Sequence, residues 1–322
     1  MVRIGNDPKP VAGIPPAFLF ARRIVSACCA GVIPAKFLEL LRSPDGNPLR
    51  EQGNEVLDDV TGVAYPVDGT IPDLRPKQEK PATEFDYQKH YQTDADTFDY
   101  FEEHTGEHAH EERRVHEAIM SYIPASAHTI LDAGCGTAWV AQEYVKRGKF
   151  VCSMDISTNN PMQALKRFPA KDHVGLVSDA FHLPIRDGSF DVIIASEIIE
   201  HTVDPKGLVH SLFAALKPGG RLIVTTPYKE KLRYTLCIHC NQATPYHSHI
   251  QSFDEKKLAS YAPPGAKTTW QTFGNKALFH LRTHPVMKHL PYEAWLAADT
   301  LANKAIDKRG HIVVVYEKLI TA

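Results

Sequence analysis

Short apolar runs separated by amphipathic stretches dominate the middle of the chain. Five of these runs predict strands, and the fourth, at residues 190–195, is apolar enough to be buried on both faces of a sheet. They occupy residues 129–131, 150–154, 174–177, 190–195 and 221–226. Residues 139–147 and 205–216 have helical spacing, and the second stretch has Asp204 as an N-cap, Pro205 at the first position and Gly219 beyond its end. The alternation predicts an α/β fold with a doubly wound, mostly parallel sheet.

The C-terminal third continues this pattern. Residues 268–273 and 311–316 predict two further strands, which brings the sheet to seven, and residues 293–306 predict a helix. A capping box that begins at Ser252 and ends at Glu255 predicts the start of a short helix.

The N-terminal part has a different texture. Residues 1–35 combine a Pro- and Gly-rich start with a short helical pattern, and we expect a flexible or helical extension there. Residues 36–80 contain turn residues between short apolar pieces, which predicts a small α+β module of hairpins. A charged, Pro-containing linker at 75–84 leads into the main domain at 85–322, which carries an insertion at 228–251.

Composition and charge exclude several classes of protein. The 322 residues are 43% hydrophobic and 23% charged, an ordinary globular balance, and the net charge of −2 gives no overall nucleic-acid footprint. No apolar run reaches the roughly 18 residues that a membrane-spanning helix needs. Arg22 and Arg23 interrupt the apolar stretch near the N-terminus, so we expect no signal peptide. The six scattered cysteines do not suggest a disulfide framework, and we expect a cytoplasmic protein.

A glycine-containing turn follows the first strand of the main domain. Asp132 and Ala133 lead into Gly134, Cys135 and Gly136, and a helical pattern follows. Glycines let a backbone bend sharply and approach a ligand closely. The turn therefore predicts a ligand site, although ligand-free strand ends with glycine are also common.

Acidic and small residues follow the next strands. Asp155, 19 residues after Gly136, can accept hydrogen bonds from ribose hydroxyls, and Ile156 follows it. Asp179 and Ala180 follow the third strand, where they suit an adenine, and Ser196 with Glu197 follows the fourth. The ends of parallel strands meet at one sheet edge, so these residues predict a nucleotide-type site there.

This ordered set of motifs resembles the class I S-adenosylmethionine (SAM)-dependent methyltransferases, in particular the branch that includes quinone-biosynthesis methyltransferases. The resemblance rests on LDAGCGT, SMDIS, SDAFHLPIRDGSFDVIIASEIIEH and LKPGGRLIVTTP. It implies a Rossmann-like fold in which Asp132 and the 134–136 loop hold the methionine end of SAM. It also implies that Asp155 holds the ribose and that Asp179 and Ala180 contact adenine. Trp139 departs from the family pattern, and either covers the pocket or packs under the helix.

Methyl transfer from a sulfonium needs alignment of the acceptor, and a base only if the acceptor must lose a proton. His201 follows the fourth strand near the expected methyl group, and its ordinary pKa suits a base at neutral pH. The alternative is a structural histidine that braces the helix beginning at Pro205. Tyr91, Tyr100 and His110 are further candidates in the segment expected to cap the site.

The insertion contains a cysteine–histidine set. Cys237, Cys240, His247 and His249 have a spacing that can supply a tetrahedral zinc site, and His239 could compete as a ligand. The stretch resembles a zinc-binding lid of some bacterial methyltransferases. Two free thiols or a redox pair are the alternatives.

Residues 36–75 resemble a zinc-ribbon-like module that activates tRNA and protein methyltransferases. The likeness lies in LELLRSPDGNPL and GVAYPVDGTIPDL. Where that family has two Cys-x-x-Cys motifs, this chain has 43–46 (SPDG) and 58–61 (DDVT), so we expect no zinc there.

The sequence thus predicts a SAM-dependent methyltransferase that acts on a small-molecule acceptor or biosynthetic intermediate, with transfer to oxygen favoured over nitrogen or carbon. One alternative is a methyltransferase of ribosomal or transfer RNA, for which a basic groove would be needed. The other is a non-catalytic partner subunit that keeps the SAM fold as a scaffold.

Overall fold

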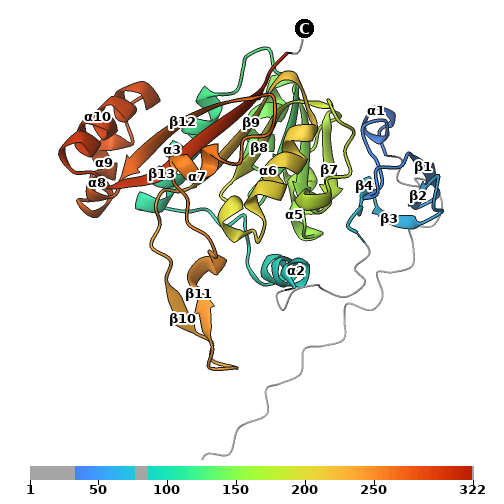
Figure 1. The fold of residues 1–322 in the computed structure, drawn as a ribbon, viewed down its shortest axis with the longest axis horizontal. Coiled ribbons are helices and arrows are strands. Elements are labelled where there is room, and N and C mark those ends of the chain that lie inside the picture. The colour runs from blue at the N-terminus through green and yellow to red at the C-terminus, as the bar shows by residue number, and fades with distance from the viewer. Residues whose placement is uncertain (1–32, 77–85, 321–322) are drawn as a thin grey trace, which may run out of the picture.

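A computed structural model describes residues 33–76 and 86–320 (Figure 1). Most of the expected N-terminal extension and most of the expected linker lie outside these residues. No helix within them is long and apolar enough to cross a membrane.

A seven-stranded sheet forms the centre of the molecule, in the order β12-β13-β9-β8-β5-β6-β7 (Figure 1). All neighbouring pairs from β9 to β7 are parallel, and β13 runs antiparallel to both of its neighbours. The α/β, Rossmann-like, mostly parallel fold predicted from the sequence is therefore confirmed. The strands are β5 (Thr129–Ala133), β6 (Phe150–Asp155), β7 (His173–Val177), β8 (Phe190–Ser196), β9 (Leu216–Pro227), β12 (Ala266–Asn275) and β13 (Arg309–Lys318).

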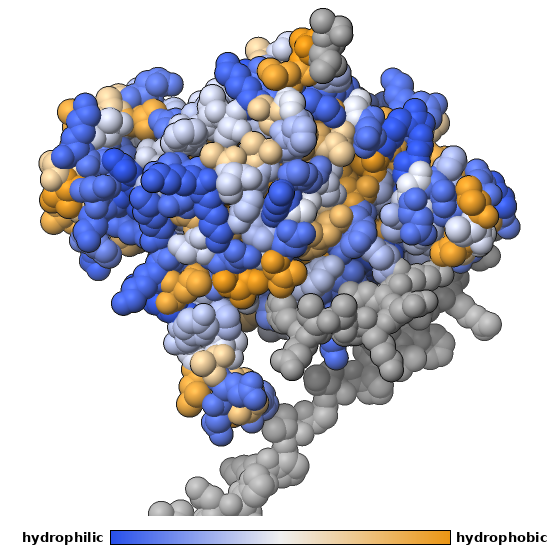
Figure 2. All heavy atoms as spheres, viewed as in Figure 1, coloured by the Kyte–Doolittle hydropathy of each residue, from blue (hydrophilic) through white to orange (hydrophobic). Residues whose placement is uncertain are grey.

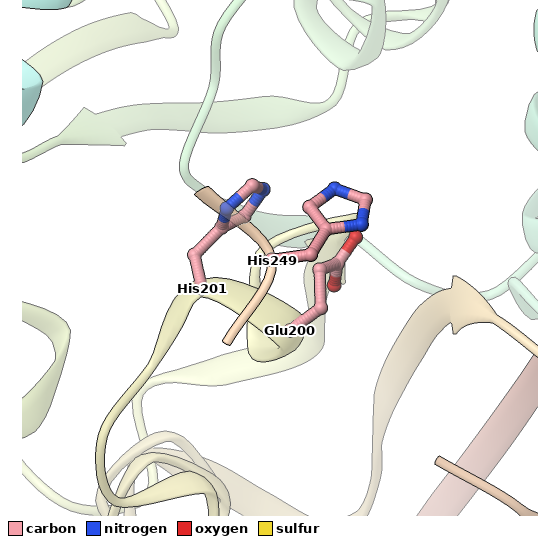
Figure 3. A group of neighbouring side chains, drawn as sticks. All are labelled: Glu200, His201 and His249. Atoms are coloured by element: carbon pink, nitrogen blue, oxygen red, sulfur yellow. The ribbon is translucent and has the colours of Figure 1, made fainter. Parts of the chain in front are cut away.

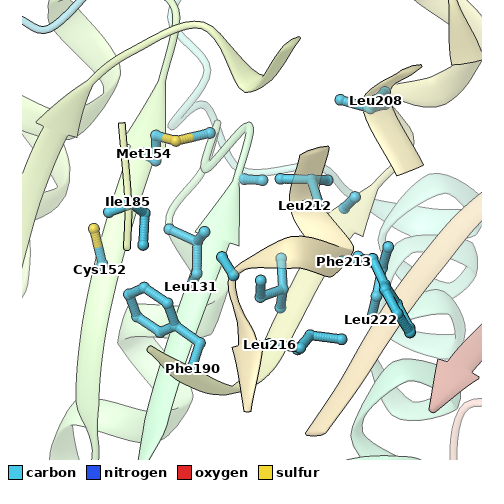
Figure 4. Packing of buried hydrophobic residues seen from close by; sticks show 14 of the residues in the cluster. Leu131, Cys152, Met154, Ile185, Phe190, Leu208, Leu212, Phe213, Leu216 and Leu222 are labelled. Atoms are coloured by element: carbon cyan, nitrogen blue, oxygen red, sulfur yellow. The ribbon is translucent and has the colours of Figure 1, made fainter. Parts of the chain in front are cut away.

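Helices cover both faces of this sheet because successive strand residues point to opposite sides. Leu131 and Ile193 belong to one buried cluster, and their neighbours Ile130 and Ile194 belong to the other. Helix α6 (Pro205–Ala214) packs on the first face, where Leu212 approaches the sheet (Figure 4). The second face is covered by α3 (Gly106–Ser121), α4 (Trp139–Tyr144) and α10 (Tyr292–Ala305).

The remaining helices are short or peripheral. They are α2 (Tyr87–Thr97), α5 (Asn159–Arg167), α7 (Glu255–Ala259), α8 (Lys276–His280) and α9 (His284–Met287), with 3-10 turns η1 (Val145–Arg147), η2 (Ala180–His182), η3 (Ile199–His201) and η4 (Tyr246–Ser248). The expected capping box needs a correction. The N-cap of α7 is Asp254, whose carboxylate accepts from the Lys257 N–H, and Ser252 lies before it.

The N-terminal module packs on the free edge of the main sheet. It consists of α1 (Ala35–Leu38) and an antiparallel sheet of β1 (Leu49–Gln52), β2 (Glu55–Asp58), β3 (Ala64–Asp68) and β4 (Ile71–Pro72). Asp73 forms a parallel bridge to Val177, and the Leu74 N–H donates to the Val177 carbonyl. Phe37 and Leu41 are fully buried in the same cluster as the residues under α6. The module thus shares its core with the main domain.

Two turns of the module meet where the zinc-ribbon resemblance directs attention. Asn47 donates through its amide to Asp58, and its N–H donates to the Ser43 hydroxyl. The other Asp58 oxygen accepts from the backbone of Val60 and Thr61. Burial disfavours the charge, but these hydrogen bonds outweigh it and lower the pKa of Asp58. A hydrogen-bonded carboxylate joins the two turns.

The insertion contains an element that the sequence patterns do not predict. Strands β10 (Tyr234–Leu236) and β11 (Ala243–Pro245) form a two-stranded hairpin that extends away from the sheet (Figure 1). Tyr234, Leu236 and Ile238 are exposed on it, and apolar residues are visible on this arm in Figure 2.

Candidate functional site

A cavity of about 1060 Å³ opens at the carboxyl ends of the parallel strands. It is lined by residues at the ends of β5, β6 and β8, by residues of α2 and α3, and by residues at the base of the insertion. Its lining includes nine of the residues predicted to bind a cofactor, namely Gly134, Cys135, Gly136, Asp155, Ile156, Asp179, Ala180, Ser196 and Glu197. Asp132 and Ala133 lie beneath it and are not among the lining residues.

The turn after β5 is held in a shape that needs glycine. Gly134 has a φ of +76°, and a Cβ placed on it would lie 2.7 Å from Cγ2 of Ile198. The N–H groups of Gly134 and Cys135 both donate to the carbonyl oxygen of Met154. This fixes the turn against the end of β6, with Gly136 facing the cavity.

Two carboxylates sit below and beside this turn. Asp155 accepts from the Asn160 amide at 3.0 Å and from the Ser157 N–H at 2.9 Å. Asp132 is 2% exposed, and its Oδ2 has no hydrogen-bond partner among the described residues. Burial, with Asp155 nearby, raises the pKa of Asp132 to about 8. Asp132 is therefore largely protonated at neutral pH.

The third predicted acidic residue is contacted by the cap. Asp179 is the N-cap of η2, where one oxygen accepts from the Phe181 N–H. Its other oxygen accepts from the Tyr87 hydroxyl on α2. The same oxygen also accepts from the Gln88 amide at 3.5 Å, and the oxygen that faces Phe181 keeps a second lone pair for a ligand.

His201 lies in the cavity beside two other ionisable groups. Ligand atoms of Glu200, His201 and His249 all lie within 4.8 Å of one another (Figure 3). The backbone of Glu200 accepts from the N–H groups of Ile250 and Gln251, which ties the end of the insertion to η3. Burial, followed by the nearby Glu197, raises the pKa of Glu200 well above its ordinary value, and Thr226 donates to its carboxyl group.

The environment of His201 sets its protonation state and its orientation. Burial, together with His249, lowers its pKa to about 4. The neutral ring can donate from Nδ1 to the Ser248 carbonyl oxygen at 3.3 Å, and this tautomer leaves the lone pair on Nε2. Tyr91 packs edge-on against the ring at 5.9 Å. His201 therefore combines cavity access with a free acceptor nitrogen.

The structure separates the four residues predicted to bind zinc. Cys237 and Cys240 lie in the turn of the β10–β11 hairpin, and His247 and His249 line the cavity at its base. His249 is paired with Glu230 at 2.6 Å instead. Three paired residues of β10 and β11 lie between the cysteines and the histidines, and each residue of a strand adds about 3.3 Å. Ligand atoms, in contrast, must lie about 2.0–2.3 Å from a zinc ion. The four side chains do not form one cluster in the described chain.

The structure places Trp139 at the cavity wall and His110 outside the cavity. Trp139 is 8% exposed, lines the cavity and stacks on His116 at 4.1 Å, so it both packs and borders the pocket. Tyr91 and Tyr100 line the same cavity. His110 does not, because it turns towards Trp295 under α10.

An ion-pair array at the cavity wall escapes prediction from the sequence. His311 on β13 lies 3.0 Å from Glu111 on α3 and 3.6 Å from Glu197 after β8. Burial opposes the charge, but the two carboxylates raise the pKa of His311 to about 10. These residues come from distant segments with no shared motif, so only the fold brings them together.

Residues 131–224 match the family model described as a methyltransferase domain. This stretch is therefore similar to a methyltransferase domain. It spans β5 to β9, and it includes the ends of β5, β6 and β8 that line the cavity.

Two curated relatives carry the same name, ubiquinone biosynthesis O-methyltransferase. The protein from Paraburkholderia xenovorans is 27% identical over 199 residues, which cover 57% of this chain and 81% of that protein. The protein from Ralstonia nicotianae is 28% identical over 125 residues, 37% of this chain and 52% of that protein. For several relatives the chain spans about half of their length.

Solved structures with similarity include an S-adenosylmethionine-dependent methyltransferase from Mesorhizobium loti. It is 16% identical, has a TM-score of 0.47, and the match covers 65% of this chain and 100% of that one. The domain match and the relatives together support a SAM-dependent methyltransferase.

Proposed function

We propose that this protein binds SAM in the cavity at the strand ends and transfers its methyl group to an oxygen of a small-molecule acceptor. The observation that carries the proposal is the convergence of the Gly134 turn, Asp155 and Asp179 on one cavity. Its volume of about 1060 Å³ matches the upper end of ligand sites, about 1,000 Å³, so it has room for a cofactor and a small acceptor.

The residues present fit this cofactor. The turn leaves no space for a side chain at Gly134 and presents backbone at Gly136, as close approach of a ligand requires. Asp155 and Asp179 both reach the cavity and retain acceptor capacity for ribose hydroxyls and an adenine amino group. Asp132, with its unpaired oxygen, would support the methionine end from below.

When bound, SAM supplies a methyl group activated by its positive sulfur. The chain's own part is to position the acceptor, exclude water and take up a proton. We assign proton uptake to Nε2 of His201. The Ser248 carbonyl oxygen can hold the ring proton on Nδ1, which leaves the lone pair on Nε2. Tyr91 and Tyr100 line the same cavity, and Tyr91 packs against the His201 ring.

A small acceptor with an acidic hydroxyl, such as a catechol, fits this arrangement. Because burial and His249 lower the pKa of His201 to about 4, its neutral ring is a weak base, so it needs a hydroxyl that loses its proton readily. The relatives named as O-methyltransferases support the same atom. The aromatic rings of Tyr91 and Phe98 at the cavity wall would pack against a flat acceptor.

Transfer of a labelled methyl group tests this function. The protein is incubated with methyl-labelled SAM and a panel of catechols and other phenols, and label in the organic product is counted. We expect label on an acceptor oxygen. Binding of SAM without transfer to any phenol, but with transfer to an amine or a carbon acid, would contradict the assignment of oxygen.

A further inference from the structure

Glu197, His311 and Glu111 form a charged array that the transfer step described above does not use. Both ring nitrogens of His311 face carboxylate oxygens, at 3.0 Å and 3.6 Å. Only the imidazolium form carries a proton on both nitrogens. With two carboxylates and one imidazolium, the array has a net charge of −1.

The fold holds this array firmly in place. Glu197 adopts a left-handed backbone with a φ of +52°, and its N–H donates to the Thr225 carbonyl at 3.1 Å. The His311 ring stacks on Phe273, and a Cβ on Gly274 would lie 3.3 Å from its Cδ2. Non-glycine residues seldom adopt this backbone conformation, and those that do are often found at functional sites.

Glu197 has unused capacity next to the cofactor turn. Its buried Oε1 accepts no hydrogen bond from residues 33–76 or 86–320, while Oε2 faces His311. The next residue, Ile198, packs against Gly134, and Glu197 and Gly134 line the same cavity. A buried, unpaired carboxylate oxygen is unfavourable, and a bound positive charge would satisfy it.

Other titratable groups lie around Glu197, namely His116, His201, His249 and Glu200. Burial lowers the pKa of His116 to about 4, so its ring is neutral. Glu197 and Glu111 are the two carboxylates that face His311 at this wall of the cavity.

We propose that Glu197, positioned by His311 and Glu111, recognises the positive sulfur of bound SAM and so distinguishes SAM from its neutral product, S-adenosylhomocysteine. This rests on the proposed function. In the transfer, the sulfur–methyl bond breaks with its electron pair left on sulfur, and a methyl–oxygen bond forms while the acceptor proton goes to His201. The cofactor loses its positive charge, so the attraction to Glu197 is lost and product release is favoured.

Titrations with both ligands test the proposal through a ratio. The affinities for SAM and for S-adenosylhomocysteine are measured by calorimetry in wild type, Glu197→Gln, His311→Gln and Glu111→Gln. Glu112→Gln, on the same wall of α3 but paired with the exposed His104, is the matched control. We expect Glu197→Gln to weaken SAM binding about tenfold more than product binding, the size of a partly buried charge pair. His311→Gln and Glu111→Gln should shift the ratio in the same direction, and the control should not.

The outcomes separate this inference from the proposed function. A wild-type preference for SAM that Glu197→Gln leaves unchanged would overturn the role of Glu197. A ratio changed by Glu197→Gln but not by His311→Gln or Glu111→Gln would overturn the positioning roles. Equal weakening of both ligands would mean that Glu197 only shapes the pocket. Well-folded wild type that binds neither ligand would overturn the proposed function itself. Glu111 is one-third exposed, so Glu111→Gln should fold and can test the proposal even if the variants at the more buried positions do not fold.

Discussion

At the scale of single residues, environment decides chemistry more than residue type. Asp132, Asp155 and Glu197 are all acidic groups around one turn. Burial, together with Asp155, raises the pKa of Asp132 to about 8, whereas His311 outweighs burial and lowers the pKa of Glu197. The sequence could predict which residues reach the cavity, because strand ends are periodic. It could not predict their charges, which depend on neighbours such as His311 from distant segments.

His201 gives a prediction at this scale. An ordinary histidine base would lose activity below its pKa of about 6.5. Since burial and His249 lower the pKa of His201 to about 4, the ring stays neutral, and kcat/KM should hold nearly constant from pH 7.5 down to about pH 5.5. His201→Gln should lower kcat by about 10²–10⁴-fold.

The pH profile is measured with the acceptor found in the labelling test, and S-adenosylhomocysteine binding at each pH serves as the control for an intact cofactor site. A profile that falls with a midpoint near pH 6.5, or near-normal turnover by His201→Gln, would show that another group takes the proton.

At the scale of elements, strands and long helices follow from periodicity, and short elements do not. The predicted strand at 221–226 became β9 (Leu216–Pro227). It begins earlier because Leu216 pairs with Phe190 of β8, and it ends one residue later because Pro227 pairs with His311 of β13. The β10–β11 hairpin has mostly exposed residues, so no apolar period marks it. Asp254 rather than Ser252 caps α7, since serine and aspartate are both favoured N-cap residues and only the backbone decides between them.

The β10–β11 hairpin contains the two cysteines of the predicted zinc site. We restrict the predicted zinc ligands to these cysteines. The N–H groups of Cys240 and His239 donate to Cys237 and lower the pKa of its thiol, which favours the metal-binding thiolate. We expect zinc in untagged protein, measured by elemental analysis, and loss of most of it in the Cys237→Ser, Cys240→Ser double variant.

His249→Ala is the informative companion variant, because His249 is paired with Glu230 in the structure. If this variant keeps its zinc, His249 is not a ligand, and residues other than His249 complete the site with the two cysteines. Untagged protein without zinc, or with equal zinc in the cysteine variant, would contradict the site.

At the scale of the whole molecule, the N-terminal module and the main domain act as one structural unit. Phe37, Leu41 and Leu74 are fully buried in the cluster that also contains Leu131 and Leu212. Arg75 donates to the carbonyl of Ile156, a cavity residue, so the module reaches the edge of the proposed cofactor site. The sequence predicted a separate module because turn residues between short apolar pieces distinguish residues 36–80 from the main domain. It could not predict the shared core, because contacts between segments on either side of a linker leave no pattern in the local sequence.

Leu41→Ala tests this unity. Removing a fully buried leucine should destabilise the protein by about 2–5 kcal/mol. Because the core is shared, calorimetry should show one cooperative transition that moves to lower temperature as a whole. Leu319→Ala, at a residue 50% exposed, should leave the transition nearly unchanged. Two separate transitions, with only the smaller one shifted, would contradict a shared core.

The central claim is that the cavity at the strand ends is a SAM site, and calorimetric titration with S-adenosylhomocysteine tests it most directly. Asp155 lines the cavity at the end of β6, and Asp187, an exposed aspartate before β8, provides the control. The account predicts micromolar binding by wild type and by Asp187→Ala, and loss of binding by Asp155→Ala. Absence of binding by well-folded wild-type protein, or equal binding by both variants, would contradict it.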